Sequence, residues 1–165
     1  MAETAEQLMF DALSGAEEPT PLLGERVAGP MVEARFEAVV AQARAAVESF
    51  FSVKLGDGVQ RARALDELVG SLRQSGWEPS AEGTALYTLQ FGALLMDAVL
   101  RECGGEAVFR SDRDLTHASV FFRATRVELF PFHKAFKAVA RKQGEPLAEL
   151  YEIARQLAAA GSPSA

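Results

Sequence analysis

Residues 103–131, CGGEAVFRSDRDLTHASVFFRATRVELFP, decide the fold class of this 165-residue chain, because the spacing of the apolar residues changes here. Three short runs rich in Val and Phe, at about 106–110, 117–123 and 126–130, are separated by the polar SDRDLT and by a tight Ala-Thr. Short β-branched and aromatic runs between turn residues are typical of antiparallel strands. We therefore predict a three-stranded antiparallel meander.

The sequence before the meander has the three- and four-residue apolar spacing of helices. We predict helices at about 30–53, 59–74 and 80–103, with Pro30 favouring the first start and Ser80 capping the third. The third helix is apolar nearly all round, so we expect it at the centre of the fold. Its predicted core contacts are Phe91, Leu94, Leu95 and, from a later helix, Phe136. The apolar stripe of the first helix comprises Val32, Phe36, Val39, Val40, Ala43, Val47, Phe50 and Phe51.

Two further helices follow the meander. Pro131 ends the third strand and begins a helix at about 131–142, and a last helix covers about 146–159. Helices before and after a small antiparallel sheet predict an α+β fold in which the helices cover one face of the sheet. We expect one domain over residues 31–160 and a frayed tail at 161–165.

Residues 1–30 read as an N-terminal arm. The stretch 14–30, SGAEEPTPLLGERVAGP, holds three prolines and three glycines, which is typical of a linker. Residues 3–13 can form a short amphipathic helix through Leu8, Phe10 and Leu13. Because so short a helix is marginal alone, we expect the arm to dock on its own fold or on a partner.

Composition predicts a folded cytoplasmic protein. The hydrophobic share of 48% and the charged share of 24% are near the average for globular domains. Cys103 is the only cysteine, so no internal disulfide forms, and the acidic N-terminus lacks the basic start of a secretory signal. No run approaches the roughly 18 apolar residues of a membrane span. A net charge of −6 argues against general nucleic-acid binding.

Basic residues gather in one stretch of this acidic chain. Residues 123–142 hold six bases and one acid, Glu128. On the predicted helix, Lys134, Lys137 and Arg141 share a stripe opposite the apolar side. We predict a basic face that recognises an acidic surface, on a protein partner or on a second copy of the chain. Its candidate binding residues are Arg123, Arg126, His133, Lys134, Lys137 and Arg141.

No motif assigns a chemistry. His133, His117 and Cys103 stand singly on different elements, without the closely spaced ligand pair of zinc sites. No phosphate-binding loop or nucleophile elbow occurs. We predict no catalytic residue, no metal and no cofactor. The acids Asp66, Glu67, Glu145, Glu149 and Glu152 are interpreted as solvated helix faces.

Three segments carry a family resemblance: LDELVGSL at 65–72, LQFGALLMDAVLRECGG at 89–105 and RVELFPFHKAFKAV at 126–139. They resemble a loosely defined group of small uncharacterised bacterial domains, in which a Leu-Asp helix precedes a buried helix ending in a glycine pair, short strands and a Pro-Phe helix start. An aromatic residue, usually Trp, tends to follow the glycine pair there, whereas this chain has EAVF. The resemblance implies a fold and a bacterial origin, and no activity.

Two functions remain open at this point. We favour a small non-enzymatic binding or adaptor module that uses the basic face at 123–142, the acidic N-terminal arm, or both. The alternative is an enzyme or a small-ligand-binding domain with a pocket between the helices and the sheet. A pocket that brings His133 or His117 to an acid would favour the alternative.

Overall fold

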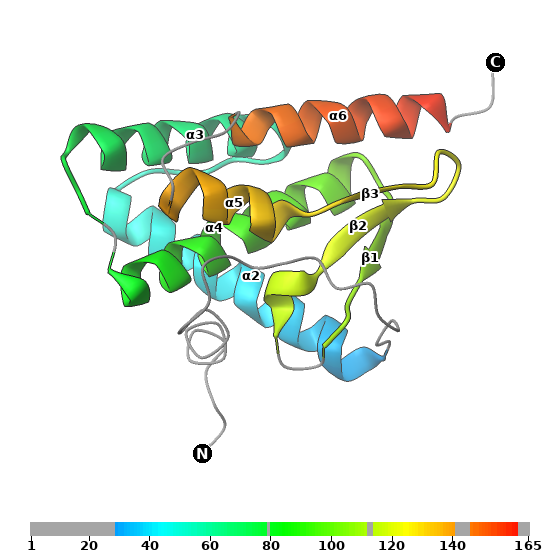
Figure 1. Cartoon of the computed structure of the whole chain (residues 1–165), viewed down its shortest axis with the longest axis horizontal. Helices are drawn as coiled ribbons and strands as arrows, with labels where there is room; N and C mark the ends of the chain where they lie inside the picture. The colour runs from blue at the N-terminus through cyan, green and yellow to red at the C-terminus, as the bar shows by residue number, and fades with distance from the viewer. Residues whose placement is uncertain (1–28, 79, 112–113, 141–145, 162–165) are drawn as a thin grey trace.

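The computed structural model describes residues 29–78, 80–111, 114–140 and 146–161. In these residues five α-helices and a three-stranded antiparallel sheet follow one another in the predicted order, and the α+β class is confirmed (Figure 1). The predicted helix at 3–13, most of the arm and the tail lie outside the described residues, as does Arg141.

The bounds of the elements agree with the prediction to within a few residues. The helices are α2 (Pro30–Phe51), α3 (Gly58–Gln74), α4 (Ala81–Glu102), α5 (Pro131–Ala140) and α6 (Leu147–Ala160). The strands are β1 (Glu106–Val108), β2 (Ser119–Phe122) and β3 (Val127–Leu129). The strand expected from residue 117 begins two residues later, because Leu115–His117 form a short 3₁₀ helix, η1. Asp114 caps η1, since its Oδ1 accepts the Thr116 N–H at 2.9 Å.

The ends of the helices follow from local chemistry. Ser80 caps α4 as predicted, because its hydroxyl accepts the Gly83 N–H at 3.0 Å. Ser52 ends α2 in the left-handed region, with φ 56°. Two successive glycines, Gly104 and Gly105, both have φ 83° and turn the chain from α4 into β1.

Helix α4 is the centre of the fold. It contacts α2, α3, α5, α6 and β2, and Figure 1 shows the other helices arranged around it. The predicted core residues Phe91, Leu94, Leu95 and Phe136 are all buried. Helix α5 crosses α4 closely at Gly92, where an added Cβ would lie 2.4 Å from the Phe132 ring.

Among the described residues α4 is long and apolar enough to cross a membrane by length and composition alone, and 72% of its apolar window is buried inside the fold. One prediction about apolar residues needs correction. Phe50, expected in the stripe of α2, is 74% exposed. It lies in the last turn, where its ring packs edge-on against Phe51 at 4.9 Å and not into the core.

The sheet lies beside the helices, with β2 between β1 and β3. Val120 of β2 is opposite Ala107 on one side and Leu129 on the other. Helices α4 and α5 contact β2, and α6 contacts β3. Helices α3 and α6 run next to one another on the side of α4 away from α2 (Figure 1).

Candidate functional site

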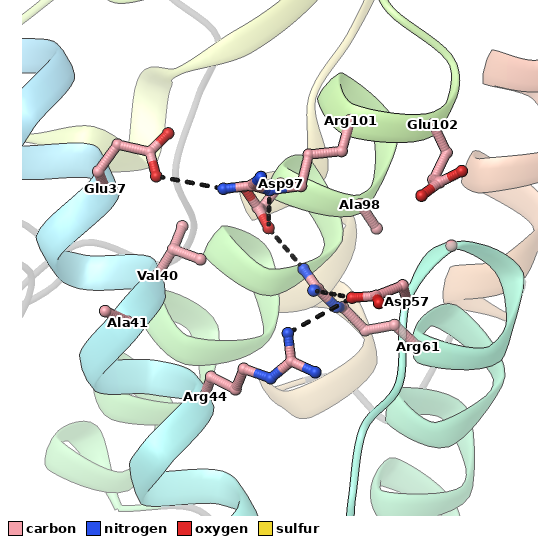
Figure 2. Close-up of a pocket in the computed structure, with 11 residues that line it drawn as sticks. Glu37, Val40, Ala41, Arg44, Asp57, Arg61, Asp97, Ala98, Arg101 and Glu102 are labelled. Atoms are coloured by element: carbon pink, nitrogen blue, oxygen red, sulfur yellow. Dashed lines mark hydrogen bonds and ion pairs between the residues drawn. The ribbon is translucent and has the colours of Figure 1, made fainter.

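A polar cleft opens where α2, α3 and α4 meet (Figure 2). Its volume is about 630 Å³. Part of the wall is apolar and consists of Val40, Ala41 and Ala98. The charged lining residues are Glu37 and Arg44 from α2, Asp57 and Arg61 at the start of α3, and Asp97, Arg101 and Glu102 from α4.

A buried ion pair forms the floor of the cleft. Arg61 is 2% exposed and Asp97 is 3% exposed, and Arg61 Nη1 donates to Asp97 Oδ2 at 2.7 Å. Arg61 Nη2 donates to Asp57 Oδ1 at 3.0 Å, and its Nε donates to the Gly56 carbonyl oxygen at 3.3 Å. A buried charge is tolerated only when it is paired and hydrogen-bonded, and both conditions are met here.

The rim of the cleft is also charged, but its ion pairs are longer. Arg101 Nη2 lies 3.6 Å from Glu37 Oε2, and Arg44 Nη1 lies 3.4 Å from Asp57 Oδ1. The side chains of Arg101 and Glu37 are 61% and 60% exposed. Arg101 is held from below, because its Nε donates to both oxygens of Asp97 at 2.9 and 3.1 Å. This hydrogen bonding raises the pKa of Arg101, so the rim cation stays charged.

The loop between α2 and α3 forms one side of the cleft. Gly56 and Gly58 have φ 66° and 55°, which glycine adopts without strain. The Gly56 carbonyl oxygen accepts from both Arg44 and Arg61, at 3.3 Å each. Leu55 anchors the loop with a side chain that is only 1% exposed. The same arginines that line the cleft therefore hold this loop in place.

Our sequence analysis did not find this cleft. Asp97 was inside a helix interpreted as apolar nearly all round, in the run LLMDAVL at 94–100. An acid in such a run is a usable signal, because a buried carboxylate needs a cation from another element. The partner was not readable, since Arg61 is 36 residues away in the sequence.

The predicted basic residues do not share one exposed face. Arg123 is exposed but its Nη2 contacts Glu106 Oε1 at 2.8 Å, and Arg126 is exposed in the turn before β3. Lys134 and Lys137 are half-buried and not exposed, because α5 is packed between α4 and α6. Lys134 Nζ lies 3.5 Å from Glu149 Oε2. His133 is also half-buried.

The interpretation of Asp66 as a solvated acid is wrong. Its Oδ1 accepts the Leu147 N–H at 2.6 Å, and its Oδ2 accepts the Ala148 N–H at 2.9 Å. These N–H groups belong to the first turn of α6 and have no partner within that helix. Asp66 therefore caps a helix 81 residues further along the chain. Glu149, also interpreted as solvated, contacts Lys134.

The pKa values of Asp114 and Cys103 are also shifted. His117 Nε2 lies 3.1 Å from Asp114 Oδ2. Burial acts to raise the pKa of Asp114, but hydrogen bonds from His117 and Thr116 outweigh it and lower the pKa. Burial raises the pKa of Cys103, although its hydrogen bond with Tyr151 acts in the opposite direction. A raised pKa disfavours the nucleophilic thiolate at Cys103.

A second, apolar groove lies between the end of α2 and the start of α4. It has a volume of about 340 Å³ and is lined by Phe50, Phe51, Leu86 and Tyr87 among others. Aromatic contacts connect this groove to the core, since the ring of Tyr87 contacts those of Phe51, Trp77 and the buried Phe91.

Across the described residues no three His, Cys, Asp or Glu side chains gather in a way that can hold a metal ion. Comparison of the chain with models of protein families, with curated proteins and with solved structures finds no match. The resemblance to small bacterial domains therefore rests on the sequence patterns alone. The site is defined by its geometry, as a charged cleft between three helices of an α+β fold.

Proposed function

We propose that this protein is a binding module and that the cleft between α2, α3 and α4 takes a small polar ligand. The observation that supports the proposal is a cleft of about 630 Å³ with a buried ion pair at its floor and exposed charges at its rim. Sites for small molecules commonly have volumes of about 300 to 1,000 Å³ and a few polar groups on an apolar wall. The cleft lies among helices, whereas the alternative left open by the sequence placed a pocket between the helices and the sheet.

The floor of the cleft suits a binding site because it is already organised. Arg61 and Asp97 are held by hydrogen bonds from three elements, so a ligand does not have to order them. The rim side chains are exposed and their ion pairs are long, so they can exchange one partner for another. A polar ligand can therefore bind by replacing ion pairs at the rim while the floor of the cleft keeps its structure.

The test is a search for ligands by amide chemical-shift mapping with a library of small polar compounds. A ligand of the cleft should shift resonances of α2, the 52–57 loop and α4 together. Ala41→Trp fills the cleft from an exposed position of α2 and should abolish these shifts. Ala38→Trp places the same ring on α2 at an exposed residue outside the cleft lining and should leave them intact. Equal binding by both variants would refute the cleft as the site.

We propose, second, that the part of the predicted basic stretch that stays exposed, around Arg126, forms an adaptor surface for an acidic partner or a second copy. The observation in its favour is that Arg126 is exposed at the start of the edge strand β3, next to the partly exposed Val127. Binding by such a surface should weaken as salt rises.

This second proposal is tested by sedimentation of the protein at low and moderate salt, alone and with a polyglutamate peptide. Arg126→Glu combined with Lys137→Glu should remove any salt-sensitive association. Arg63→Glu with Lys54→Glu, at exposed positions outside this surface, makes the same charge change and should not. Association that is absent in every variant, or equal in all of them, contradicts the adaptor surface.

A further inference from the structure

We propose that the ligand of the cleft is an α-amino acid with an aliphatic side chain, bound as a zwitterion between Arg101 and Glu37. This inference rests on the proposed function of the cleft and names the chemical class of its ligand. In the bound state the ligand carboxylate pairs with Arg101, the ligand ammonium group pairs with Glu37, and the aliphatic side chain lies along Val40, Ala41 and Ala98.

The ion pairs at the floor of the cleft are shorter than those at its rim, and a ligand can replace only the longer ones. The floor pairs of Arg61 with Asp97 and Asp57 are 2.7 and 3.0 Å long, within hydrogen-bond range. The rim pair of Arg101 with Glu37 is 3.6 Å long, beyond that range, and both of its side chains are more than half exposed. Exposed ion pairs contribute about 1 kcal/mol or less, so this pair is easily exchanged. A ligand therefore enters at the rim and leaves the floor intact.

The opposite charges of Arg101 and Glu37 favour a ligand that carries both charges. An anion that takes Arg101 leaves Glu37 without its cation, and a cation that takes Glu37 leaves Arg101 without its acid. A zwitterion replaces one long pair by two new pairs and leaves neither group uncompensated. The overall charge of the lining points the same way, because three arginines face four carboxylates. A lining of nearly balanced charge does not attract a simple anion strongly.

The guanidinium group of Arg101 is oriented by Asp97. Its Nε is occupied by Asp97 from below, which fixes the plane of the guanidinium group, and its Nη2 is the atom that faces Glu37. Figure 2 shows Arg101 lying over Asp97 with Glu37 reaching toward it from α2. A planar fork held in this way is prepared for a carboxylate. The two charges of an α-amino acid are close together, which suits insertion between two side chains that already face one another.

The cleft also has apolar lining residues that can contact the side chain of the ligand. The apolar residues of the lining are Val40 and Ala41, which lie below Glu37 on α2, and Ala98, which lies on the α4 side of the cleft (Figure 2). An aliphatic side chain placed there loses contact with water, which favours it by about 0.8 kcal/mol per buried CH₂. A charged ligand side chain gains no such stabilisation from burial. The wall therefore selects an aliphatic amino acid.

The experiment compares three probes by titration calorimetry and amide shifts: L-valine, N-acetyl-L-valine and L-valinamide. The first carries both charges, the second only the carboxylate and the third only the ammonium group. We expect valine to bind in the cleft and each derivative to bind at least about tenfold more weakly, because each loses one charge-assisted pair. L-Leucine and L-isoleucine extend the series for the apolar wall.

Two variants assign the two ends of the ligand. Arg101→Gln should weaken the binding of valine and N-acetylvaline but not that of valinamide, whereas Glu37→Gln should weaken the binding of valine and valinamide but not that of N-acetylvaline. Glu37 is exposed, so its variant keeps the fold even if Arg101→Gln disturbs Asp97. Arg63→Gln and Glu33→Gln, at exposed positions outside the cleft, are the matched controls.

Two results would overturn the inference. One is that a derivative with a single charge binds as tightly as valine. The other is that none of the three aliphatic amino acids shifts resonances of the cleft. In either case the binding function itself is judged separately, because the polar library and the Ala41→Trp variant report on any ligand of the cleft whatever its charge.

Discussion

Arg61 and Asp97 are buried charges that join α3 to α4 at the base of the cleft. A buried ion pair adds little net stability, because removing two charges from water costs nearly as much as their attraction returns. Breaking it is different, since the remaining charge is then buried without its partner. Arg61 keeps one other acid, Asp57, whose side chain is 71% exposed and well hydrated.

Asp97→Asn should therefore lower the free energy of unfolding by about 3 to 5 kcal/mol, as measured by urea denaturation. The control is the double variant Arg61→Met with Asp97→Leu, which removes both charges and should cost less than the single change. A loss below about 1 kcal/mol in Asp97→Asn would mean that Asp57 alone compensates Arg61.

Asp114 predicts a pH dependence of stability. Its pKa is lowered in the folded protein by His117 and Thr116, against the effect of burial, so the unfolded chain binds the proton more readily. The stabilisation is present above the ordinary aspartate pKa of about 3.9 and is lost as the pH falls through the lowered folded pKa. Urea unfolding of wild type and Asp114→Asn should differ most at neutral pH and converge in acid. A difference that stays constant with pH would contradict this account, and Glu67→Gln is the matched exposed control.

At the scale of the elements, α6 depends on a side chain of α3 for its first turn. Asp66 accepts two of the N–H groups that a helix leaves without partners. Asp66→Ala should lower the free energy of unfolding by about 0.5 to 2 kcal/mol, the usual range for loss of an N-cap. Hydrogen exchange should show faster exchange at Leu147 and Ala148. Glu67→Ala, at the next and exposed residue, should change neither measurement.

The central position of α4 can be tested at its buried residue Leu94. Leu94 has no exposed surface and lies in the helix that all the others contact. Leu94→Ala should cost about 2 to 5 kcal/mol by removing buried methyl groups and leaving a cavity. Ile153→Ala removes a large apolar side chain from a position of α6 that is 38% exposed, and it should cost clearly less. A change below about 0.5 kcal/mol for Leu94→Ala would contradict the central place of α4.

At the scale of the whole molecule, one hydrophobic core contains residues from every helix that the structure describes and from β2. It begins with Val32 and Phe36 in the first turns of α2, so the core extends to within a few residues of the predicted arm. Two bases of the stretch 123–142 form ion pairs with acids outside it, Lys134 with Glu149 and Arg123 with Glu106.

We expect the predicted N-terminal arm to be removable without unfolding the rest of the protein. Limited proteolysis should cut rapidly around residues 17–26, in the stretch rich in proline, glycine and acids, and should leave residues 29–161 folded, because that part already buries a complete core. Mass spectrometry of the fragments and the thermal unfolding of the large fragment measure both points. Global unfolding after the cut would show that the arm is part of the core.

Local sequence patterns are enough to predict the order and type of the elements, because periodicity, helix caps and turn residues act over a few neighbours. Ser80, Pro131 and the Val- and Phe-rich runs between 106 and 130 suffice for the α+β class. What went wrong locally, the start of β2, depended on a hydrogen bond from Thr116 to Asp114 that competes with strand formation.

The partners of the charged side chains of Arg61, Asp97 and Asp66 depend on how the helices pack. The ion pair of Arg61 with Asp97 joins residues 36 positions apart, and the hydrogen bond from the Leu147 N–H to Asp66 joins residues 81 positions apart, so no local pattern relates them. The sequence shows that a carboxylate lies in an apolar helix, but the cation that neutralises it is chosen by how α3 packs on α4. Helix packing also forms the cleft beside α2. The lysines of α5 are half-buried for the same reason, because the exposure of a charged side chain depends on the neighbouring helices and not only on its own helix.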